Sequence, residues 1–281
     1  MTPQNDLFVV ENAVSLLVQE TGVPIYDFNF RNWFACQSLW PGHSTRKVIA
    51  RLGAFSDYAK QSDDLRSQGI ELIHSEQEHL RATRLPVWYH LIADLTPHSK
   101  WYSELPTANQ IEEDFRWPVF IKGERQTSLH SQSLSVAKSR ENYDWLIDQY
   151  ATDSILRCQS VVVREFIALR RVEEVYGDRV PSSYEFRTFW WRGELVGSGR
   201  YWYQGKDYEW TSNEKQAAIA VADIAAKRIN IPFLVIDLAM TLDGQWIVIE
   251  CNDGQESGYA GVSPIGLWQS IVACEQRMRM D

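Results

Sequence analysis

The chain has 281 residues, of which 44% are hydrophobic and 23% charged, with a formal net charge of -9. This composition is typical of a soluble globular protein, and the length favours two or three lobes over a single core. The acidic balance argues against a broad nucleic-acid-binding surface, and no apolar run approaches the roughly 20 residues of a membrane span. Four scattered cysteines and the lack of a recognisable leader favour a cytoplasmic protein.

The first part of the chain reads as alternating strands and helices. Strands are predicted over 7–10, 23–28, 47–52 and 70–74, and helices over 13–19, 56–68 and 87–93. The capping box Ser75-x-x-Glu78 opens a further helix. This alternation is typical of an α/β domain, which we predict to span residues 1–112.

Residues 113–281 have a different character and are predicted to form a second domain. Its smaller lobe, 113–170, would contain a strand over 117–123, a hydroxyl-rich segment over 124–133, a helix over 139–150 and a buried strand over 160–167. Its larger lobe, 171–281, would contain two hairpins, an alanine-rich helix over 215–229 and a closing helix over 265–278.

The most informative stretch is a predicted β-hairpin over residues 233–252. Two apolar runs flank the Asp-Gly pair at 243–244, which is typical of a two-residue hairpin turn. Counting outward places Asp237 opposite Glu250, and the strand period of two puts Asn252 on the same face. Facing carboxylates destabilise a sheet, whereas Mg²⁺ binds such oxygens together with water and phosphate. The hairpin therefore predicts a magnesium site; the alternative is the solvated face of an edge hairpin.

A second predicted hairpin covers residues 184–203 and turns at the Arg-Gly pair at 192–193. A two-residue turn there places Glu185 opposite Arg200, with Arg187 diagonally adjacent on the same face. Two guanidinium groups beside one carboxylate leave positive charge free for a phosphate or a substrate carboxylate. The alternative is an exposed cross-strand ion pair, which contributes only about 0–1 kcal/mol.

Two weaker signals precede these hairpins. Lys122 lies at a predicted strand end, where its ammonium suits a nucleotide phosphate, although a surface lysine is the plainer interpretation. The apolar strand that ends in Arg164-Glu165-Phe166-Ile167 frees backbone groups for an adenine edge. Most strands that end this way simply belong to the core.

The order of these pieces resembles the ATP-grasp superfamily, and within it the carboxylate–amine ligases, over roughly residues 110–265. The resemblance implies an α/β (α+β) protein: an ATP-grasp fold with antiparallel sheets in two lobes, preceded by a small α/β pre-ATP-grasp domain. The features that carry it are, in chain order, Lys122, Arg164-Glu165-Phe166-Ile167, Glu185-Phe186-Arg187, Arg200, Asp237 and Glu250-Cys251-Asn252.

The resemblance also implies how ATP would be held. Lys122 would contact the nucleotide phosphates, and Glu165, Phe166 and Ile167 would line the adenine site. An acidic residue after this hinge would meet the ribose, and Glu173, with Glu174 beside it, is taken as the candidate.

The reacting groups follow from the same resemblance. Arg187 and Arg200 would face the γ-phosphate and an acyl-phosphate intermediate, while Asp237, Glu250 and Asn252 would hold Mg²⁺. The chain departs from the family pattern in one respect. Members commonly carry a second phosphate-binding lysine, and the only nearby candidate, Lys138, stands at the start of a predicted helix.

The expected activity is that of an ATP-dependent ligase. A substrate carboxylate would attack the γ-phosphate of Mg-ATP to give an acyl phosphate, which an amine or a thiol would then open. A non-ligating phosphotransferase and a non-catalytic ATP-binding regulatory module are the alternatives. The expected partners are small-molecule or peptide carboxylates and amines, with no nucleic acid and no membrane. The helix over 215–229 packs either on the sheet or on a second subunit, so a homodimer stays open.

Overall fold

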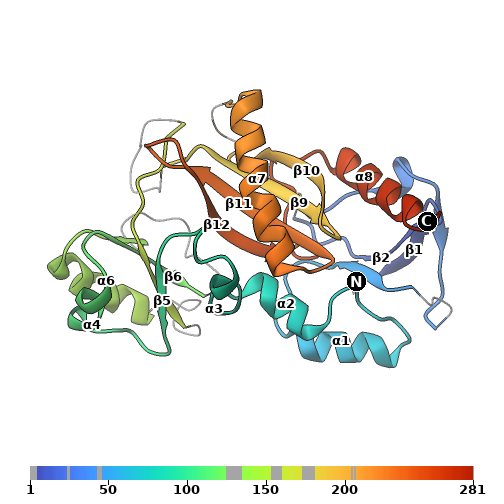
Figure 1. Cartoon of the computed structure of the whole chain (residues 1–281). Helices are drawn as coiled ribbons and strands as arrows, with labels where there is room; N and C mark the ends of the chain where they lie inside the picture. Colours follow the sequence, from blue (N-terminus) through green and yellow to red (C-terminus); the bar gives the residue numbers. More distant parts are fainter. Residues whose placement is uncertain are drawn as a thin grey trace.

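The computed structural model describes residues 5–23, 26–42, 46–124, 135–152, 160–172, 181–203, 205 and 207–280. Within these ranges, three four-stranded sheets form the framework and helices cover their faces (Figure 1). The mixed α/β architecture with antiparallel sheets is the one predicted from the sequence. Among the described residues, no helix combines the length and apolar character that a membrane span needs.

The N-terminal sheet has the strand order β3-β1-β2-β4. β1 and β2 form a hairpin, β3 pairs antiparallel with β1, and β4 pairs parallel with β2. The strands are β1 (Asp6–Val10), β2 (Val14–Val18), β3 (Cys36–Ser38) and β4 (Val48–Arg51), with a single 3-10 turn, η1 (Phe30–Asn32), before β3.

The helix predicted over 13–19 is wrong, because these residues form β2. Glu11 and Asn12 take positive φ angles of 48° and 52°, which reverse the chain. The apolar run that follows then pairs along its whole length with β1. At 70–74 the predicted strand is reduced to one bridge between Leu72 and Val48, and the strand predicted over 23–28 includes residues outside the described ranges.

Two capped helices follow this sheet. Asp57 caps α1 (Tyr58–Ser67), and the predicted capping box of Ser75 and Glu78 is present at α2 (Glu76–Thr83). A short α3 (Leu85–Trp88) and a 3-10 turn η2 (Tyr89–Leu91) lead to the next lobe.

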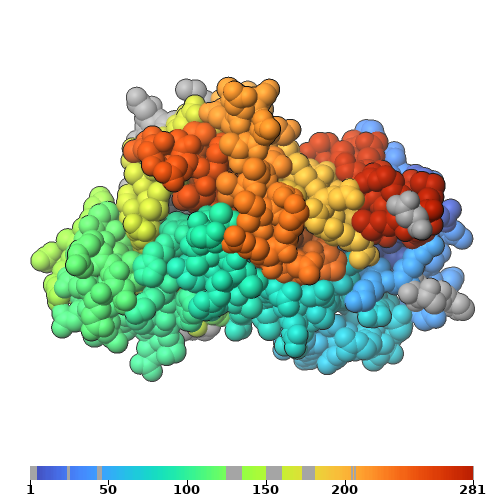
Figure 2. Space-filling view, in the orientation of Figure 1, coloured from blue at the N-terminus to red at the C-terminus, as the bar shows by residue number. Residues whose placement is uncertain are grey.

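The small lobe is built on an antiparallel sheet with the order β5-β8-β6-β7. Its core includes Ile111, Val119, Tyr143 and Val163, all buried, and the lobe stands at one end of the molecule (Figure 2). β5 pairs with β8, so the boundary predicted at residues 112–113 falls inside this lobe. The elements are β5 (Ser99–Tyr102), α4 (Ala108–Asp114), β6 (Val119–Gly123), β7 (Val136–Ala137), α6 (Arg140–Thr152) and β8 (Val161–Glu165).

The central sheet is antiparallel throughout, with the order β10-β9-β11-β12. α7 covers one face, and α8 packs with the N-terminal sheet on the other. The elements are β9 (Glu185–Trp191), β10 (Glu194–Arg200), α7 (Ser212–Ile229), β11 (Phe233–Met240), β12 (Trp246–Asp253) and α8 (Pro264–Arg277).

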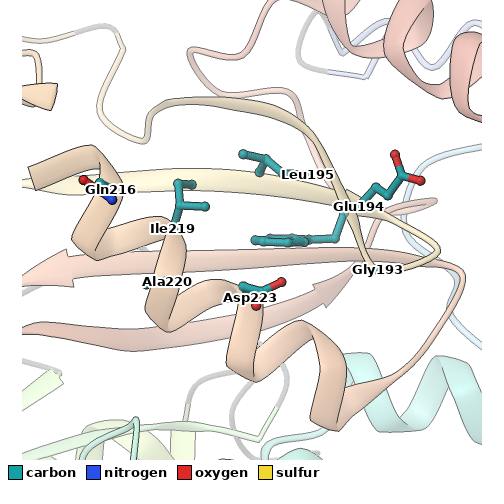
Figure 3. Close-up of a pocket in the computed structure, with 8 residues that line it drawn as sticks. Gly193, Glu194, Leu195, Gln216, Ile219, Ala220 and Asp223 are labelled. Atoms are coloured by element: carbon teal, nitrogen blue, oxygen red, sulfur yellow. The ribbon is translucent and has the colours of Figure 1, made fainter. Parts of the chain in front are cut away.

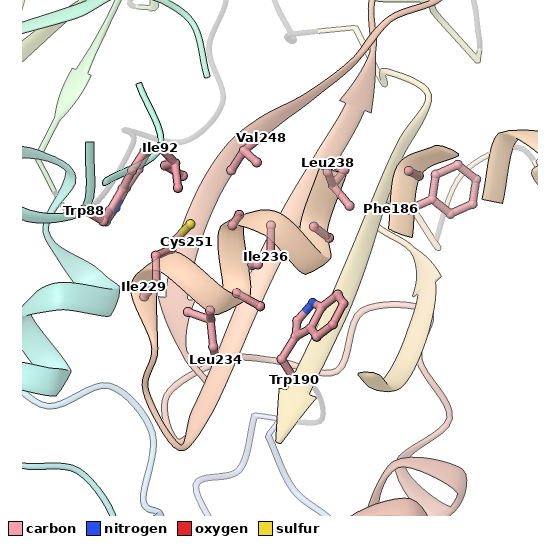
Figure 4. Close-up of a cluster of buried hydrophobic side chains, with 14 of the residues drawn as sticks. Trp88, Ile92, Phe186, Trp190, Ile229, Leu234, Ile236, Leu238, Val248 and Cys251 are labelled. Carbon is pink, nitrogen blue, oxygen red and sulfur yellow. The ribbon is translucent and has the colours of Figure 1, made fainter. Parts of the chain in front are cut away.

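The alanine stripe of α7 lies against the sheet. Ala218, Ala222 and Ala225 are fully buried, and these small side chains let the helix axis approach β11 and β12 closely. Figure 4 shows Ile229 of α7 beside Leu234 of the sheet. Thr211 forms the capping box at its start, as predicted.

Candidate functional site

One face of the central sheet changes from apolar to charged along its strands. Asp237 of β11 faces both Glu250 of β12 and Arg187 of β9. Directly opposed residues project to one face, and Asn252 follows Glu250 at the strand period. The predicted pairing of Asp237 with Glu250 is confirmed.

The turn that leads to this pairing differs from the prediction. Thr241 donates its N–H to the Gln245 carbonyl at 2.8 Å, which closes a three-residue loop. The loop ends at Gly244, whose φ of 86° suits the left-handed position of such a turn. Compared with a two-residue turn, this loop displaces the strand pairing by one residue.

A β-bulge in β12 restores the register. Leu238 faces Val248, whereas the preceding residue, Asp237, faces Glu250, so Ile249 is the extra residue. The longer turn and the bulge cancel each other. The two carboxylates therefore meet as the simpler hairpin predicts, although for a different structural reason.

Arg187 and Asp237 form a buried bidentate ion pair. Arg187 donates from Nε and Nη2 to the two Asp237 oxygens, both at 2.8 Å, and from Nη1 to the Gly258 carbonyl at 2.8 Å. Burial alone would lower the pKa of Arg187, but the Asp237 carboxylate outweighs it and the pKa lies above its ordinary value. The pair also ties the loop after β12 to the sheet.

Lys122 reaches Glu250 from the small lobe. Its Nζ forms an ion pair with Glu250 Oε1, and Asn252 Nδ2 donates to Glu250 Oε2 at 3.4 Å. Burial favours the neutral carboxyl, yet the Lys122 ammonium holds the pKa of Glu250 below its usual range. The predicted phosphate lysine and a predicted metal ligand thus meet where the two lobes join.

Glu185 places a neutral carboxyl beside these ion pairs. Burial and the nearby Asp237 charge raise the pKa of Glu185 to about 8. Ser183 Oγ donates to its Oε2 at 2.8 Å. At neutral pH the carboxyl therefore keeps its proton and adds no negative charge to the site.

Tyr201 is a member of this cluster that the sequence reasoning missed. The Arg187 guanidinium lies 5.0 Å from the centre of its ring. Tyr201 N–H donates to the Glu185 carbonyl at 2.9 Å. The only sequence signal was its position directly after the predicted strand.

The donor set suits Mg²⁺ completed by other ligands. Within the described residues, no group of three or more His, Cys, Asp or Glu side chains could hold a metal ion. Mg²⁺ needs only one or two carboxylates when phosphates and water fill the remaining positions. Glu250 and Asn252 are partly exposed and offer oxygens, whereas Asp237 is 1% exposed and offers the lone pairs that Arg187 leaves.

The predicted adenine segment follows the end of β8 and leads into the central sheet. Glu165 and Phe166 are exposed, and Ile167 is half-buried. Arg170 N–H then donates to the Met240 carbonyl at 2.8 Å. The segment therefore connects the two lobes beside the charged face; its contact with adenine stays a prediction.

The predicted register of the second hairpin is wrong at Arg200. The two-residue turn at 192–193 forms as predicted, with φ angles of 47° and 83°. A β-bulge in β10 then shifts the pairing by one residue, so Arg200 faces Phe186 instead of Glu185. Arg200 forms an ion pair with the exposed Asp207.

Other predicted residues have simpler outcomes. Glu173 and the segment 125–133 lie outside the described residues. Lys138 is exposed and directly follows β7, the strand that pairs with the strand of Lys122, and α6 begins two residues later. Lys138 thus stands at a strand end, not in the helix predicted there.

A buried polar network directly after β12 was also missed. Asp253 Oδ2 accepts from His74 Nδ1 at 2.9 Å and from His79 Nδ1 at 3.0 Å, and Phe233 N–H donates to His74 Nε2 at 3.0 Å. Burial opposes ionisation of Asp253, but the two imidazoles hold its pKa well below the usual range. These partners are far apart in sequence, so no local pattern reveals them.

Arg51 extends this network from the N-terminal sheet. Its Nη1 donates to the carbonyls of Gly254, Gln255 and Ser257 at 2.8, 3.0 and 2.8 Å. The next residue, Gly258, accepts from Arg187. The N-terminal region therefore shapes the loop that closes over the charged face.

A separate groove lies between α7 and the hairpin of β9 and β10. Its volume is about 550 Å³, and Trp190, Leu195 and Ile219 contribute apolar surface (Figure 3). Trp190 belongs to the apolar face of the sheet under α7, opposite the face of Arg187. The groove is therefore distinct from the charged site.

Two antiparallel sheets joined by a hinge, with a lysine of one meeting an acidic hairpin of the other, define an ATP-grasp protein. A family described as an ATP-grasp domain, the third family of its clade, matches residues 126–271, more than half of the 281-residue chain, and the chain belongs to this family. The match includes both hairpins and begins shortly after Lys122.

The chain is also similar to solved structures. A RimK domain ATP-grasp protein from Sphaerobacter thermophilus aligns at 14% identity with a TM-score of 0.55, over 82% of this chain and 78% of that one. A D-alanine–D-alanine ligase from Bacillus anthracis, complexed with ATP, aligns at 12% identity and a TM-score of 0.56, over 83% and 79%. The VanG D-Ala:D-Ser ligase from Enterococcus faecalis aligns at 13% identity and a TM-score of 0.58, over 82% and 72%. At these identities the likeness shows the fold. No curated protein matches the sequence.

Proposed function

We propose that the protein is an ATP-dependent ligase that joins a carboxylate to an amine or a thiol. The observation that carries the proposal is the meeting of Lys122, Arg187 and the acidic hairpin at the lobe junction of an ATP-grasp chain. Two of the similar structures are named as ligases of D-alanine, which supports this class of reaction.

In this proposal, ATP binding exchanges the partners of the charged groups. Lys122 leaves Glu250 for the phosphates, and Glu250, Asn252 and Asp237 hold Mg²⁺, which would neutralise charge on the phosphates. The adenine lies against the segment 165–167, with Glu173 as the candidate for the ribose. Glu185 remains protonated and so does not repel the triphosphate.

The proposed reaction has two steps. A carboxylate oxygen of the substrate attacks the γ-phosphorus, and the bond to the β-phosphate oxygen breaks to release ADP. The amine or thiol then attacks the acyl carbon, phosphate leaves with the electron pair of the carbon–oxygen bond, and the nucleophile loses its proton. Lys122 and Arg187 stabilise the charge that develops on the phosphoryl oxygens. Arg200 would assist only after leaving Asp207.

Hydroxylamine provides a test that does not require the natural amine. It opens an acyl phosphate to a hydroxamate, so a panel of carboxylates can be screened with Mg-ATP for hydroxamate and ADP together. Glu250→Ala should abolish both products. Asp223→Ala is the matched control, because Asp223 pairs with Lys227 on the surface of α7 and should leave turnover unchanged.

Three outcomes would contradict the proposal. ADP release that Glu250→Ala leaves undiminished would exclude the hairpin from the reaction. Phosphorylation of a hydroxyl without hydroxamate would identify a phosphotransferase. Tight ATP binding without turnover across the panel would favour a regulatory module.

A further inference from the structure

The outer edge of β12 is closed by a loop. β12 ends the strand order of its sheet, so among the described strands only β11 pairs with it. Val248 donates its N–H to the Leu95 carbonyl at 2.8 Å, and Thr96 Oγ1 donates to the Val248 carbonyl at 2.8 Å. The segment before β5 thus takes the place of a fifth strand.

Arg164 adds a side chain to this contact. It lies on β8, is 4% exposed, and donates from Nη1 to the Ile249 carbonyl at 2.8 Å. Its Nη2 donates to Thr96 Oγ1 at 2.6 Å and its Nε to Ser99 Oγ at 3.1 Å. A guanidinium buried against carbonyl and hydroxyl oxygens costs free energy of desolvation. Its placement therefore needs a reason beyond filling space.

The position of Ile249 supplies that reason. Ile249 is the extra residue of the bulge, and its carbonyl has no place in the ladder with β11. If the bulge closed, Ile249 would face Asp237, and Glu250 would move to the opposite face, because a one-residue slip exchanges the faces of a strand. That face is the apolar cluster of Ile236 and Val248.

We propose that Arg164 is a positioning residue that pins the bulge at Ile249 and so keeps Glu250 on the side of the sheet where metal and phosphates bind. The inference rests on the function proposed above. Arg164 directly precedes Glu165, the first residue of the adenine segment. The same residue therefore couples the strand that leads to the nucleotide base with the hairpin that holds the metal.

The first test compares nucleotide binding with and without Mg²⁺, using a fluorescent ATP analogue and either a Mg²⁺ titration or a chelator. Arg164→Met should raise the Mg²⁺ concentration for half-saturation by roughly 10- to 100-fold, the range for outer-shell partners of a metal ligand. Binding in the chelator should change little, because the adenine segment is intact. Arg164→Lys should recover part of the effect, since an ammonium can still donate to the Ile249 carbonyl.

Two further variants guard against a trivial result. Thr96→Val removes the hydroxyl between Arg164 and Val248 but keeps the guanidinium, so it should give a smaller shift in the same direction. Arg140→Met is the matched control, because Arg140 pairs with Glu112 on the surface of the same lobe. If Arg164→Met does not fold, Thr96→Val decides the question.

The second test needs no ligand. Hydrogen exchange of the amides in residues 246–253 should accelerate in Arg164→Met, while the amides of α7 keep their protection. Equal loss of binding with and without Mg²⁺ would overturn the inference, since a general loosening of the lobes predicts that pattern. If the wild-type chain binds no Mg-nucleotide, the ligase proposal fails, and unchanged exchange of β12 would then overturn this inference separately.

Discussion

Replacing Lys122 with methionine removes the ammonium from Glu250 while keeping most of the side-chain volume. The two residues come from different sheets, so their ion pair joins the small lobe to the central sheet. The substitution should lower the stability of the ligand-free protein, because Glu250 loses its counterion.

The magnitude follows from charge and exposure. Unit charges about 4 Å apart attract by about 4 kcal/mol at an effective dielectric constant near 20. The Glu250 side chain is 25% exposed, so water recovers part of that attraction when the ammonium is removed. We expect a loss of about 2 kcal/mol, below the range for a fully buried pair, and a decrease in Tm of roughly 4 °C.

Metal binding should change in the opposite direction. Lys122 and a cation compete for the same Glu250 oxygens, so Lys122→Met should bind Mn²⁺ more tightly in the absence of nucleotide. It should bind Mg-ATP more weakly, because the phosphates lose the ammonium. Isothermal titration with Mn²⁺ alone and with Mg-ATP measures both effects.

Lys100→Met provides the control, since Lys100 pairs with Asp114 on the surface of the same lobe. It should change neither affinity. Mn²⁺ affinity that stays equal or falls in Lys122→Met would refute the idea that Lys122 and the metal share Glu250. An unchanged Tm would refute the estimate of the ion pair.

Three further changes test the surrounding structure. Since the pKa of Glu185 is raised from 4.5 to about 8, the folded state holds a proton that the unfolded chain releases, and stability should fall as the pH rises through this window. In Glu185→Gln this decline should be absent, so the variant gains in Tm relative to wild type from pH 5 to pH 8; parallel curves would contradict the assignment. A Cβ on Gly199 would lie 2.4 Å from the Gly261 carbonyl oxygen, so Gly199→Ala should cost about 1–3 kcal/mol in urea unfolding. Gly266→Ala, whose Cβ would be 3.6 Å from its nearest neighbour, should not, and equal midpoints would refute the close approach. Asp253→Asn leaves two imidazole N–H groups without a carboxylate and should cost on the order of 3 kcal/mol, which the same unfolding measurement checks.

Local signals in the sequence predict much of this fold. Capping boxes at Ser75 and Thr211 locate two helix starts, because an N-cap hydroxyl and a glutamate three residues later satisfy each other's backbone donors. Alternation and turn residues locate both hairpins of the central sheet. The first hairpin of the chain was missed because Glu11 and Asn12, which form its turn, are ordinary residues in a left-handed conformation.

Register depends on events that local patterns do not show. Each hairpin of the central sheet contains one bulge, and a bulge moves the pairing by one residue. In β12 the bulge compensates for a longer turn, so Asp237 meets Glu250. In β10 the turn is the predicted one and the bulge is uncompensated, so Arg200 misses Glu185. Counting from a turn is therefore reliable only up to the first bulge.

The pairing of charges is the other feature that sequence reasoning could not supply. The sequence predicts cations for phosphates and anions for a metal, but without ligands these groups neutralise each other. Arg187 holds Asp237 with two hydrogen bonds in a site where Asp237 is 1% exposed, so this pair should persist when a ligand binds. Lys122 holds the partly exposed Glu250 through a single oxygen. Because an ammonium makes no fixed fork and can rotate to another acceptor, the Lys122 pair is the one that should open for Mg-ATP.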